Sequence, residues 1–199
     1  MNRVVVTGIG IVSSLGNNQQ EVKDSLYNTK SGISFDEDQK KMGFRSCVSG
    51  QIKIDLENSI ERKFLRFMGD GASYNYLSML EAIKDSNLSE DEISNNKTGL
   101  IMGSGGPSTK SLLRAFDITR EKGPKKIGPT SVPKVMCSTN SATLSTYFKI
   151  KGVNYSISSA CSTSAHCIGN AYELIQMGKQ NRVFAGGGEE LDWTLSALF

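Results

Sequence analysis

The sequence predicts an α/β layered domain with a largely parallel sheet. Three short apolar stretches have the composition of strands buried on both faces: Val4–Val6, Thr98–Gly103 and Arg182–Gly188. Segments with the 3.6-residue period of amphipathic helices lie between them. Alternating strands and helices favour a parallel sheet covered by helices. No linker, repeat or low-complexity stretch interrupts the sequence, so we expect a single domain over residues 1–199.

The composition is that of an ordinary globular domain, with 38% hydrophobic and 22% charged residues. A net charge of +3 is too small to indicate nucleic-acid binding, and no apolar run of about 18 residues predicts a membrane span. The N-terminus does not have the pattern of a signal peptide. We therefore expect a cytoplasmic protein that binds neither nucleic acid nor membrane. Four cysteines follow no zinc spacing, and we expect them reduced, with no metal and no cofactor: Cys47, Cys137, Cys161 and Cys167.

The first part of the chain combines strand signals with one clear helix start. The glycine pair Gly8-x-Gly10 lacks the third glycine of a dinucleotide fingerprint, because position 13 is Ser13, so we expect no nucleotide site there. The elements expected before residue 60 are a buried strand at 4–6, a helix through Tyr27 capped by Asn17 or Asn18, and a short strand within 45–54.

The middle of the chain carries stronger local signals. Ser89-x-x-Glu92 has the spacing of a capping box, and residues 104–109 form a glycine-rich loop after the strand at 98–103. The other elements expected here are a helix from Asp70 to about Asn87, a surface loop over 119–131 and a helix of small residues over 133–149.

The stretch 154–170 organises the rest of the chain. Alternating residues lead into it as a strand, and the pattern then changes to a helical stripe that ends near Gly178. This change falls within a residue or two of Cys161. A thiol at the first turn of a helix meets free N–H groups and loses its proton more easily, and the thiolate is a nucleophile. The alternative is a structural cysteine buried where strand and helix meet.

A basic helical face is predicted near residue 64. Arg62, Lys63 and Arg66 share one face of a short helix through their spacing. Such a face is either simply solvated or docks an acidic partner. The spacing alone favours a solvated face.

Four stretches together resemble β-ketoacyl-[acyl-carrier-protein] synthases, the condensing enzymes of fatty-acid synthesis: Arg3–Asn18, Gly103–Gly106, Gly152–Ala171 and Phe184–Leu191. The segment Ser-Ala-Cys-Ser-Thr-Ser around Cys161 is specific to condensing enzymes, and Ala-His-Cys-Ile-Gly-Asn-Ala after it points to the type I, elongating branch. The resemblance runs over the whole chain and corresponds to the N-terminal half of that family.

The resemblance implies a thiolase-like layered fold, of which this chain would form the N-terminal half with a mainly parallel five-stranded sheet. It implies that Cys161 accepts an acyl chain from acyl-carrier protein as a thioester, with its own backbone N–H in the oxyanion hole. Malonyl-carrier protein then loses CO₂, and the resulting carbanion attacks the thioester. These implications favour the nucleophile interpretation of Cys161.

The resemblance also assigns binding residues. It places Met136, Leu195 and Phe199 along the acyl pocket, although plain core packing explains each of them equally well. It favours the docking interpretation of the basic face and implies a homodimer whose interface includes the strand before Cys161. The residues implied to dock the acidic carrier protein are Arg62, Lys63 and Arg66, with Arg45 and Lys125 as additions.

The chain departs from the family in one respect. The family decarboxylates with two histidines and a lysine from its second half, whereas the only histidine here is His166. His166 is not four residues from Cys161, so we expect it to be a packed or hydrogen-bonded helix residue rather than a base. We expect that this chain alone does not complete condensation. The alternatives are a non-catalytic scaffold or truncated subunit that dimerises or binds carrier protein, and a thiolase or initiating synthase.

Overall fold

A three-stranded parallel sheet lies at the centre of the computed structural model, which describes residues 1–199. Its strands are β3 (Thr98–Gly103), β4 (Asn154–Tyr155) and β5 (Arg182–Gly187), in the order β4-β3-β5. β3 pairs with β5 along its whole length, from Thr98 opposite Arg182 to Gly103 opposite Gly187. β4 forms one edge of the sheet and pairs with β3 only at Leu100 and Ile101.

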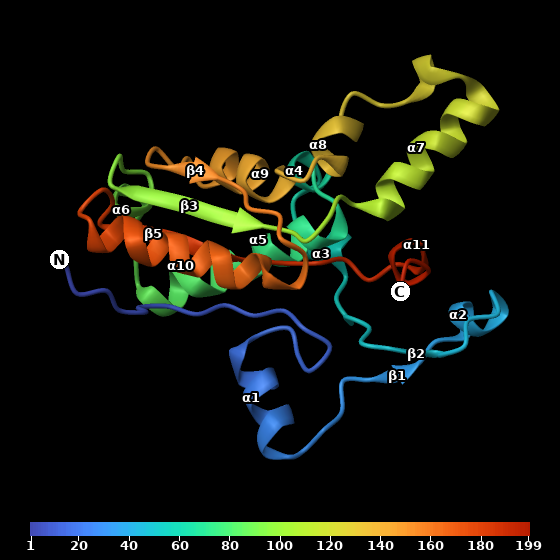
Figure 1. The fold of residues 1–199 in the computed structure, drawn as a ribbon, viewed down its shortest axis with the longest axis horizontal. Helices are drawn as coiled ribbons and strands as arrows, with labels where there is room; N and C mark the ends of the chain where they lie inside the picture. The colour runs from blue at the N-terminus through green and yellow to red at the C-terminus, as the bar shows by residue number, and fades with distance from the viewer.

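Helices cover both faces of this sheet (Figure 1). α5 (Asp70–Ser86) and α9 (Thr139–Tyr147) lie on one face, and α10 (Thr163–Gln176) lies on the other. Side chains of β3 alternate between the two layers. Leu100 and Met102 pack with residues of α5 and α9, whereas Ile101 packs with residues of α10. Every residue of β3 is buried, which explains its continuous apolar composition.

The remaining elements surround these three layers. β1 (Ser34–Phe35) and β2 (Val48–Ser49) form a separate antiparallel pair. None of the helices combines the length and apolar character needed to cross a membrane. The other helices are α1 (Gln19–Tyr27), α2 (Glu37–Lys41), α3 (Leu56–Ser59), α4 (Arg62–Leu65), α6 (Glu90–Ile93), α7 (Thr109–Lys122), η1 (Pro124–Lys126), α8 (Ser131–Val135), η2 (Ala160–Ser162) and α11 (Trp193–Ser196).

An aromatic cluster anchors the short basic helix α4 to the core. The ring of Phe64 meets that of Tyr147 edge-on at 4.2 Å between centroids, and Tyr147 meets Tyr76 in the same way at 4.7 Å. Phe148 completes the cluster against Tyr76 and Tyr147. Because edge-to-face aromatic pairs add about 0.5–1.5 kcal/mol beyond burial, this cluster holds α4 in place while its charged residues face solvent.

The predicted five-stranded sheet is wrong for these residues, because the parallel sheet has three strands. The N-terminal run Val4–Val6 forms no strand, and the side chains of Val5 and Val6 are 59% and 79% exposed. The segment that follows is held by acidic side chains of α5 instead of by strand pairing. The Ile9 N–H donates to Asp85 Oδ2 at 2.9 Å, and the Ile11 N–H donates to Glu81 Oε2 at 2.9 Å.

Three predicted elements are shorter than expected. β4 stops at Tyr155, and the next residue, Ser156, contacts β3 through its side chain, whose hydroxyl donates to the Met102 carbonyl at 2.7 Å. The helix predicted over 133–149 is interrupted at Met136, whose extended backbone (ψ 141°) separates α8 from α9. The short strand predicted within 45–54 is reduced to Val48–Ser49.

The helix ends with clear local chemistry were predicted correctly. Asn18 caps α1 by accepting from the Glu21 N–H at 2.9 Å, and Ser89 and Glu92 form the capping box of α6. α5 ends at Asn87 in the left-handed conformation (φ 54°), and Gly178 after α10 has φ 73°. α7 was not predicted, although Ser108 gives it an N-cap and Gly123 (φ 80°) ends it.

Candidate active site

Cys161 lies at the junction predicted from the sequence, in η2, two residues before the first residue of α10. Its side chain is exposed, so a reagent in solution can reach the sulfur. The backbone N–H of Cys161 donates no hydrogen bond to another group of the chain. An exposed thiol beside a free amide at a helix start combines a nucleophile with a donor for an oxyanion.

The turn that presents Cys161 has an unusual backbone. Ala160, directly before it, is left-handed with φ 50°, although alanine carries a Cβ. This conformation costs on the order of 1–2 kcal/mol for such a residue, so the surrounding contacts must stabilise it. The turn is closed by the Ser162 N–H, which donates to the Ser159 carbonyl at 3.1 Å.

Thr163 links the two sides of this turn. Its hydroxyl accepts from the Ser159 N–H at 2.9 Å and donates to the Ala160 carbonyl at 2.8 Å. Thr163 is buried, whereas Cys161 beside it is exposed. This role could not be predicted from the sequence, because a threonine in the first turn of a helix fits many patterns.

His166 is the hydrogen-bonded helix residue that was predicted. Its Nδ1 lies 2.7 Å from the hydroxyl of Ser159, and no hydrogen bond joins its side chain to Cys161. The imidazole is therefore hydrogen-bonded to the residue that enters the turn and not to the sulfur.

The glycine loop after β3 packs against the turn from the other side. The hydroxyl of Ser158 donates to the Gly105 carbonyl at 3.2 Å, and a Cβ on Gly105 would lie 3.1 Å from the Cα of Ala160. Glu189, just after β5, holds this loop. It accepts from the Gly105 N–H and from the Ser104 hydroxyl, the latter at 3.0 Å. A side chain at position 105 would therefore crowd Ala160, and glycine there allows the close approach of the two segments.

The other cysteines differ from Cys161 in their surroundings. Cys167 is 0% exposed, and burial raises the pKa of its thiol, which keeps it protonated and unreactive. Cys137 is exposed, but it lies in the connection between α8 and α9. All four cysteines are free, and no group of three or more His, Cys, Asp or Glu side chains is placed to hold a metal ion.

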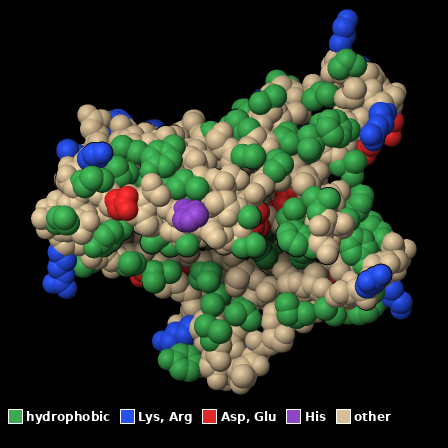
Figure 2. Space-filling view, viewed as in Figure 1, with side chains coloured by type: hydrophobic (Ala, Val, Ile, Leu, Met, Phe, Trp, Pro, Cys, Tyr) green, Lys and Arg blue, Asp and Glu red, His purple; other side chains and the backbone are tan.

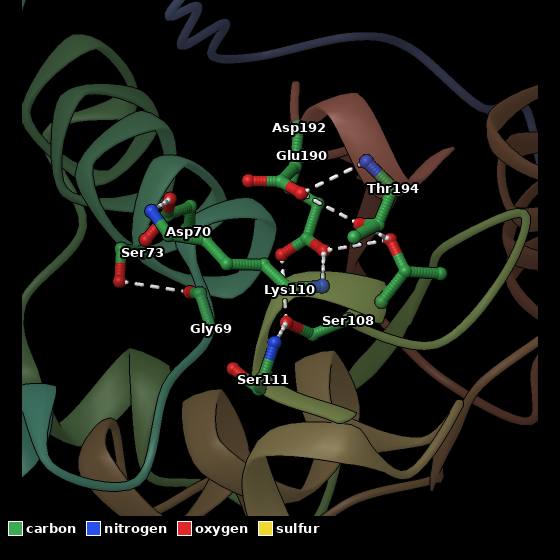
Figure 3. Close-up of polar contacts among 10 residues, drawn as sticks. Gly69, Asp70, Ser73, Ser108, Lys110, Ser111, Glu190, Asp192 and Thr194 are labelled. Carbon is green, nitrogen blue, oxygen red and sulfur yellow. Dashed lines mark hydrogen bonds and ion pairs between the residues drawn. The ribbon is translucent and has the colours of Figure 1, made fainter. Parts of the chain in front are cut away.

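A polar cluster that sequence reasoning missed fixes the segment after β5 (Figure 3). Glu190 is only 8% exposed and accepts from the Ser108 hydroxyl at 2.7 Å and the Lys110 N–H at 3.1 Å. Burial raises the pKa of Glu190, and the hydrogen bond from Ser108 opposes that rise. Lys110 also forms a 2.7 Å ion pair with Asp70. The start of α7, the start of α5 and the chain after β5 are thereby joined.

The predicted basic residues are all exposed. On α4, Lys63 forms a 2.7 Å ion pair with Glu61, and its ammonium lies 4.7 Å from the centroid of Phe64. The remaining two come from other parts of the chain: Arg45 lies between α2 and β2, and Lys125 lies in η1.

The three residues predicted to line an acyl pocket lie at the margins of the domain. Met136 is half-buried at the end of α8, and Leu195 is half-buried in α11, which packs on α7. Phe199 is 100% exposed at the last position of the chain.

With this geometry established, comparison with known proteins gives the family. The family model described as "Beta-ketoacyl synthase, N-terminal domain" matches residues 1–197. The chain therefore belongs to the beta-ketoacyl synthase family, which confirms the resemblance seen in the sequence.

Within the family, the chain is similar to proteins named 3-oxoacyl-[acyl-carrier-protein] synthase 1. It is 54% identical over 200 residues to 3-oxoacyl-[acyl-carrier-protein] synthase 1 of Haemophilus influenzae, covering 100% of this chain and 49% of that protein. It is 55% identical over 201 residues to the protein of the same name from Escherichia coli strain K12, covering 100% of this chain and 50% of that protein. The chain thus spans about half the length of the relatives it matches.

Solved structures agree with this placement. A crystal structure of a beta-ketoacyl synthase from Burkholderia phymatum STM815 superposes with a TM-score of 0.88 at 30% identity, covering 100% of this chain and 50% of that one. A type II polyketide ketosynthase, solved in complex with its acyl-carrier protein, has a TM-score of 0.76 at 20% identity over 96% of this chain and 52% of that one. At that identity the second likeness shows the fold alone.

Proposed function

We propose that Cys161 is the acyl-accepting nucleophile of a 3-oxoacyl-[acyl-carrier-protein] synthase of fatty-acid elongation. The observation that carries the proposal is the position of this thiol. It is exposed, it follows a left-handed residue, and it lies beside its own free backbone N–H at the start of α10. The identity to synthases named 1 in two bacteria supports the choice of substrate class.

In the proposed transfer, the thiolate of Cys161 attacks the carbonyl carbon of an acyl thioester on the carrier protein. The carbonyl oxygen becomes an oxyanion, which the Cys161 N–H stabilises by hydrogen bonding. The intermediate collapses as the bond to the carrier's sulfur breaks. The acyl chain remains on Cys161 as a thioester, and the carrier's thiolate leaves and takes up a proton. No cofactor takes part in this transfer.

For the whole enzyme we propose decarboxylative condensation with malonyl-carrier protein. We propose that His166, whose Nδ1 lies 2.7 Å from the Ser159 hydroxyl, is a structural residue of α10 and not the group that promotes CO₂ loss. We propose that this step depends on residues of a second half comparable to the other half of the relatives, which are about twice as long as this chain.

We propose that the acidic carrier protein docks on the basic patch, defined as Arg62, Lys63, Arg66, Arg45 and Lys125. The aromatic cluster beneath α4 supports this role, because it gives three of these charges a fixed platform. We propose Met136, Leu195 and Phe199 as acyl-pocket residues, completed in the assembled enzyme.

A homodimer is part of the proposal. β4 is an edge strand whose residues are exposed, and an edge strand offers free backbone groups for pairing. Figure 2 shows hydrophobic side chains over the face that carries α10, where Ile168 and Tyr172 are 55% and 47% exposed. Such a surface favours association. A cytoplasmic location is consistent with four unpaired cysteines.

The test is acyl loading. The chain is incubated with octanoyl-loaded acyl-carrier protein, and its intact mass is measured together with that of the Cys161→Ser and Cys137→Ser variants. We expect one octanoyl group on the wild type and on Cys137→Ser, and none on Cys161→Ser. Binding of carrier protein without loading of the wild type would instead support a scaffold subunit.

A further inference from the structure

One hydroxyl group, that of Thr163, bonds the residues on both sides of the peptide bond that enters the left-handed turn before Cys161. The Thr163 hydroxyl accepts from the Ser159 N–H at 2.9 Å and donates to the Ala160 carbonyl at 2.8 Å. The Thr163 N–H donates to the same carbonyl. These contacts bracket Ala160, whose φ of 50° sets the direction in which the next residue, Cys161, leaves the turn.

The orientation of this hydroxyl is fixed by packing. Thr163 is 3% exposed, and a Cβ placed on Gly103 would lie 2.7 Å from the Thr163 methyl carbon. The methyl therefore faces the end of β3, which leaves the hydroxyl facing the turn. A threonine in a helix readily donates to the carbonyl three residues earlier, which here is that of Ala160.

We propose that Thr163 is a positioning residue for acyl transfer, which holds Ala160 left-handed and thereby aligns the sulfur and the N–H of Cys161 on one carbonyl group. This inference rests on the proposed function of Cys161. Thr163 is 3% exposed and its hydroxyl bonds only backbone groups of the turn, so we expect it to act on Cys161 through the backbone.

Two reactions of the Cys161 sulfur, acyl transfer and alkylation, depend differently on this alignment. Acyl transfer forms an oxyanion and needs the Cys161 N–H in place. Alkylation by iodoacetamide displaces iodide at a saturated carbon and forms no oxyanion, so it needs only an accessible thiol. Loss of the Thr163 hydroxyl is expected to slow the first reaction and to leave the second nearly unchanged.

The experiment compares Thr163→Val, which keeps the shape but removes the hydroxyl, with Thr163→Ser, which keeps the hydroxyl. The acyl donor is an octanoyl thioester of N-acetylcysteamine, so docking of carrier protein does not enter. The matched control is Thr143→Val on α9, which also removes a hydroxyl that bonds a helix carbonyl, that of Thr139 at 2.6 Å. Acylation and alkylation of Cys161 are both followed by mass spectrometry, and the melting temperature of each variant is recorded.

We expect Thr163→Val to slow acyl transfer about tenfold, the equivalent of one to two lost hydrogen bonds, with alkylation changed less than about twofold. Thr163→Ser should restore transfer, and Thr143→Val should not change it. Wild-type transfer in Thr163→Val would overturn the inference. So would an equal fall in both rates accompanied by a lower melting temperature, because that result indicates a purely structural role.

A second readout keeps the inference testable if the wild type accepts no acyl group, a result that would contradict the proposed function. Amide hydrogen exchange at Ser159 reports directly on the turn. Thr163→Val should speed this exchange on the order of tenfold, and Thr163→Ser should not. Unchanged exchange in Thr163→Val would overturn the role of Thr163 independently of any acyl chemistry.

Discussion

Gly103, the last residue of β3, lies directly against the carbonyl oxygen of Ile157, so closely that no Cβ fits between them. Ile157 belongs to the segment that leads from β4 to the turn before Cys161. The end of the central strand therefore determines how near that segment lies, and only glycine allows the observed approach.

Gly103→Ala is therefore expected to destabilise the fold by about 1–3 kcal/mol, because the added methyl group meets a backbone carbonyl that cannot move aside. Gly106→Ala is the matched control, since nothing lies within 4 Å of the position of its added Cβ. Urea denaturation of both variants measures the difference. Equal stability of the two variants would show that the segment holding Ile157 is free to shift.

The buried hydrogen bond between Asn75 and Asn140 predicts a second stability effect. Asn75 Nδ2 donates to Asn140 Oδ1 at 2.9 Å, joining α5 to α9 beneath the sheet. Asn140→Ala leaves the Asn75 amide buried without this acceptor, which is expected to cost about 1–3 kcal/mol. Asn58→Ala is the control, because Asn58 is exposed and bonds only near the start of α3. The urea midpoints of the two variants are compared with that of the wild type. A similar loss of stability in both variants would contradict the prediction.

Glu190 predicts a pH dependence of stability. Burial raises its pKa above the ordinary value of 4.5 in the folded protein, so the folded state holds this proton more tightly than the unfolded chain does. The contribution of Glu190 to the free energy of unfolding therefore falls as the pH rises from about 4.5 through the folded pKa, and then levels off.

Glu190→Gln stays neutral at every pH, so its free energy of unfolding minus that of the wild type should increase over this range. Urea titrations at several pH values from 4 to 8 measure this difference. Glu57→Gln on exposed α3 is the control for a general effect of removing one negative charge. A difference that does not change with pH would mean that burial does not raise the pKa of the Glu190 carboxyl.

The basic patch predicts a loss that depends on the acyl donor. Replacing Arg62 and Arg66 with glutamate is expected to raise the KM for octanoyl-loaded carrier protein on the order of tenfold at low salt, because attraction to an acidic partner becomes repulsion. The same variant should react normally with the small N-acetylcysteamine thioester, which needs no docking surface. The double variant with Lys40→Glu and Lys41→Glu, in exposed α2, makes the same change in net charge and is the control. A KM that is unchanged and insensitive to salt would show that the basic patch does not dock the carrier protein.

Local chemistry explains which parts of the fold were predictable from the sequence. Asn18, Asn87 and the Ser89–Glu92 capping box act within one helical turn, so their residue types determine the helix ends. β3 was predictable because helices cover both of its faces, and its composition reports that burial.

The missed features depend on contacts between distant parts of the chain. Val4–Val6 has the composition of a buried strand, yet the segment after it is held by Glu81 and Asp85, which lie 70 and 76 residues after the backbone groups that they bond. Glu190 is buried because it meets the start of α7, and Thr163 matters because Ala160 is left-handed. No pattern within a short window carries such information.

The most direct test of the central claim is the location of the acyl group after loading. Digestion of the octanoyl-loaded chain with trypsin releases residues 152–179 as one peptide that holds both Cys161 and Cys167. Fragmentation of this peptide by mass spectrometry should place the added mass on Cys161, with Cys167 and the exposed Cys137 unmodified. An acyl group found mainly on Cys137, or distributed among the cysteines according to exposure alone, would contradict the assignment of Cys161 as the nucleophile.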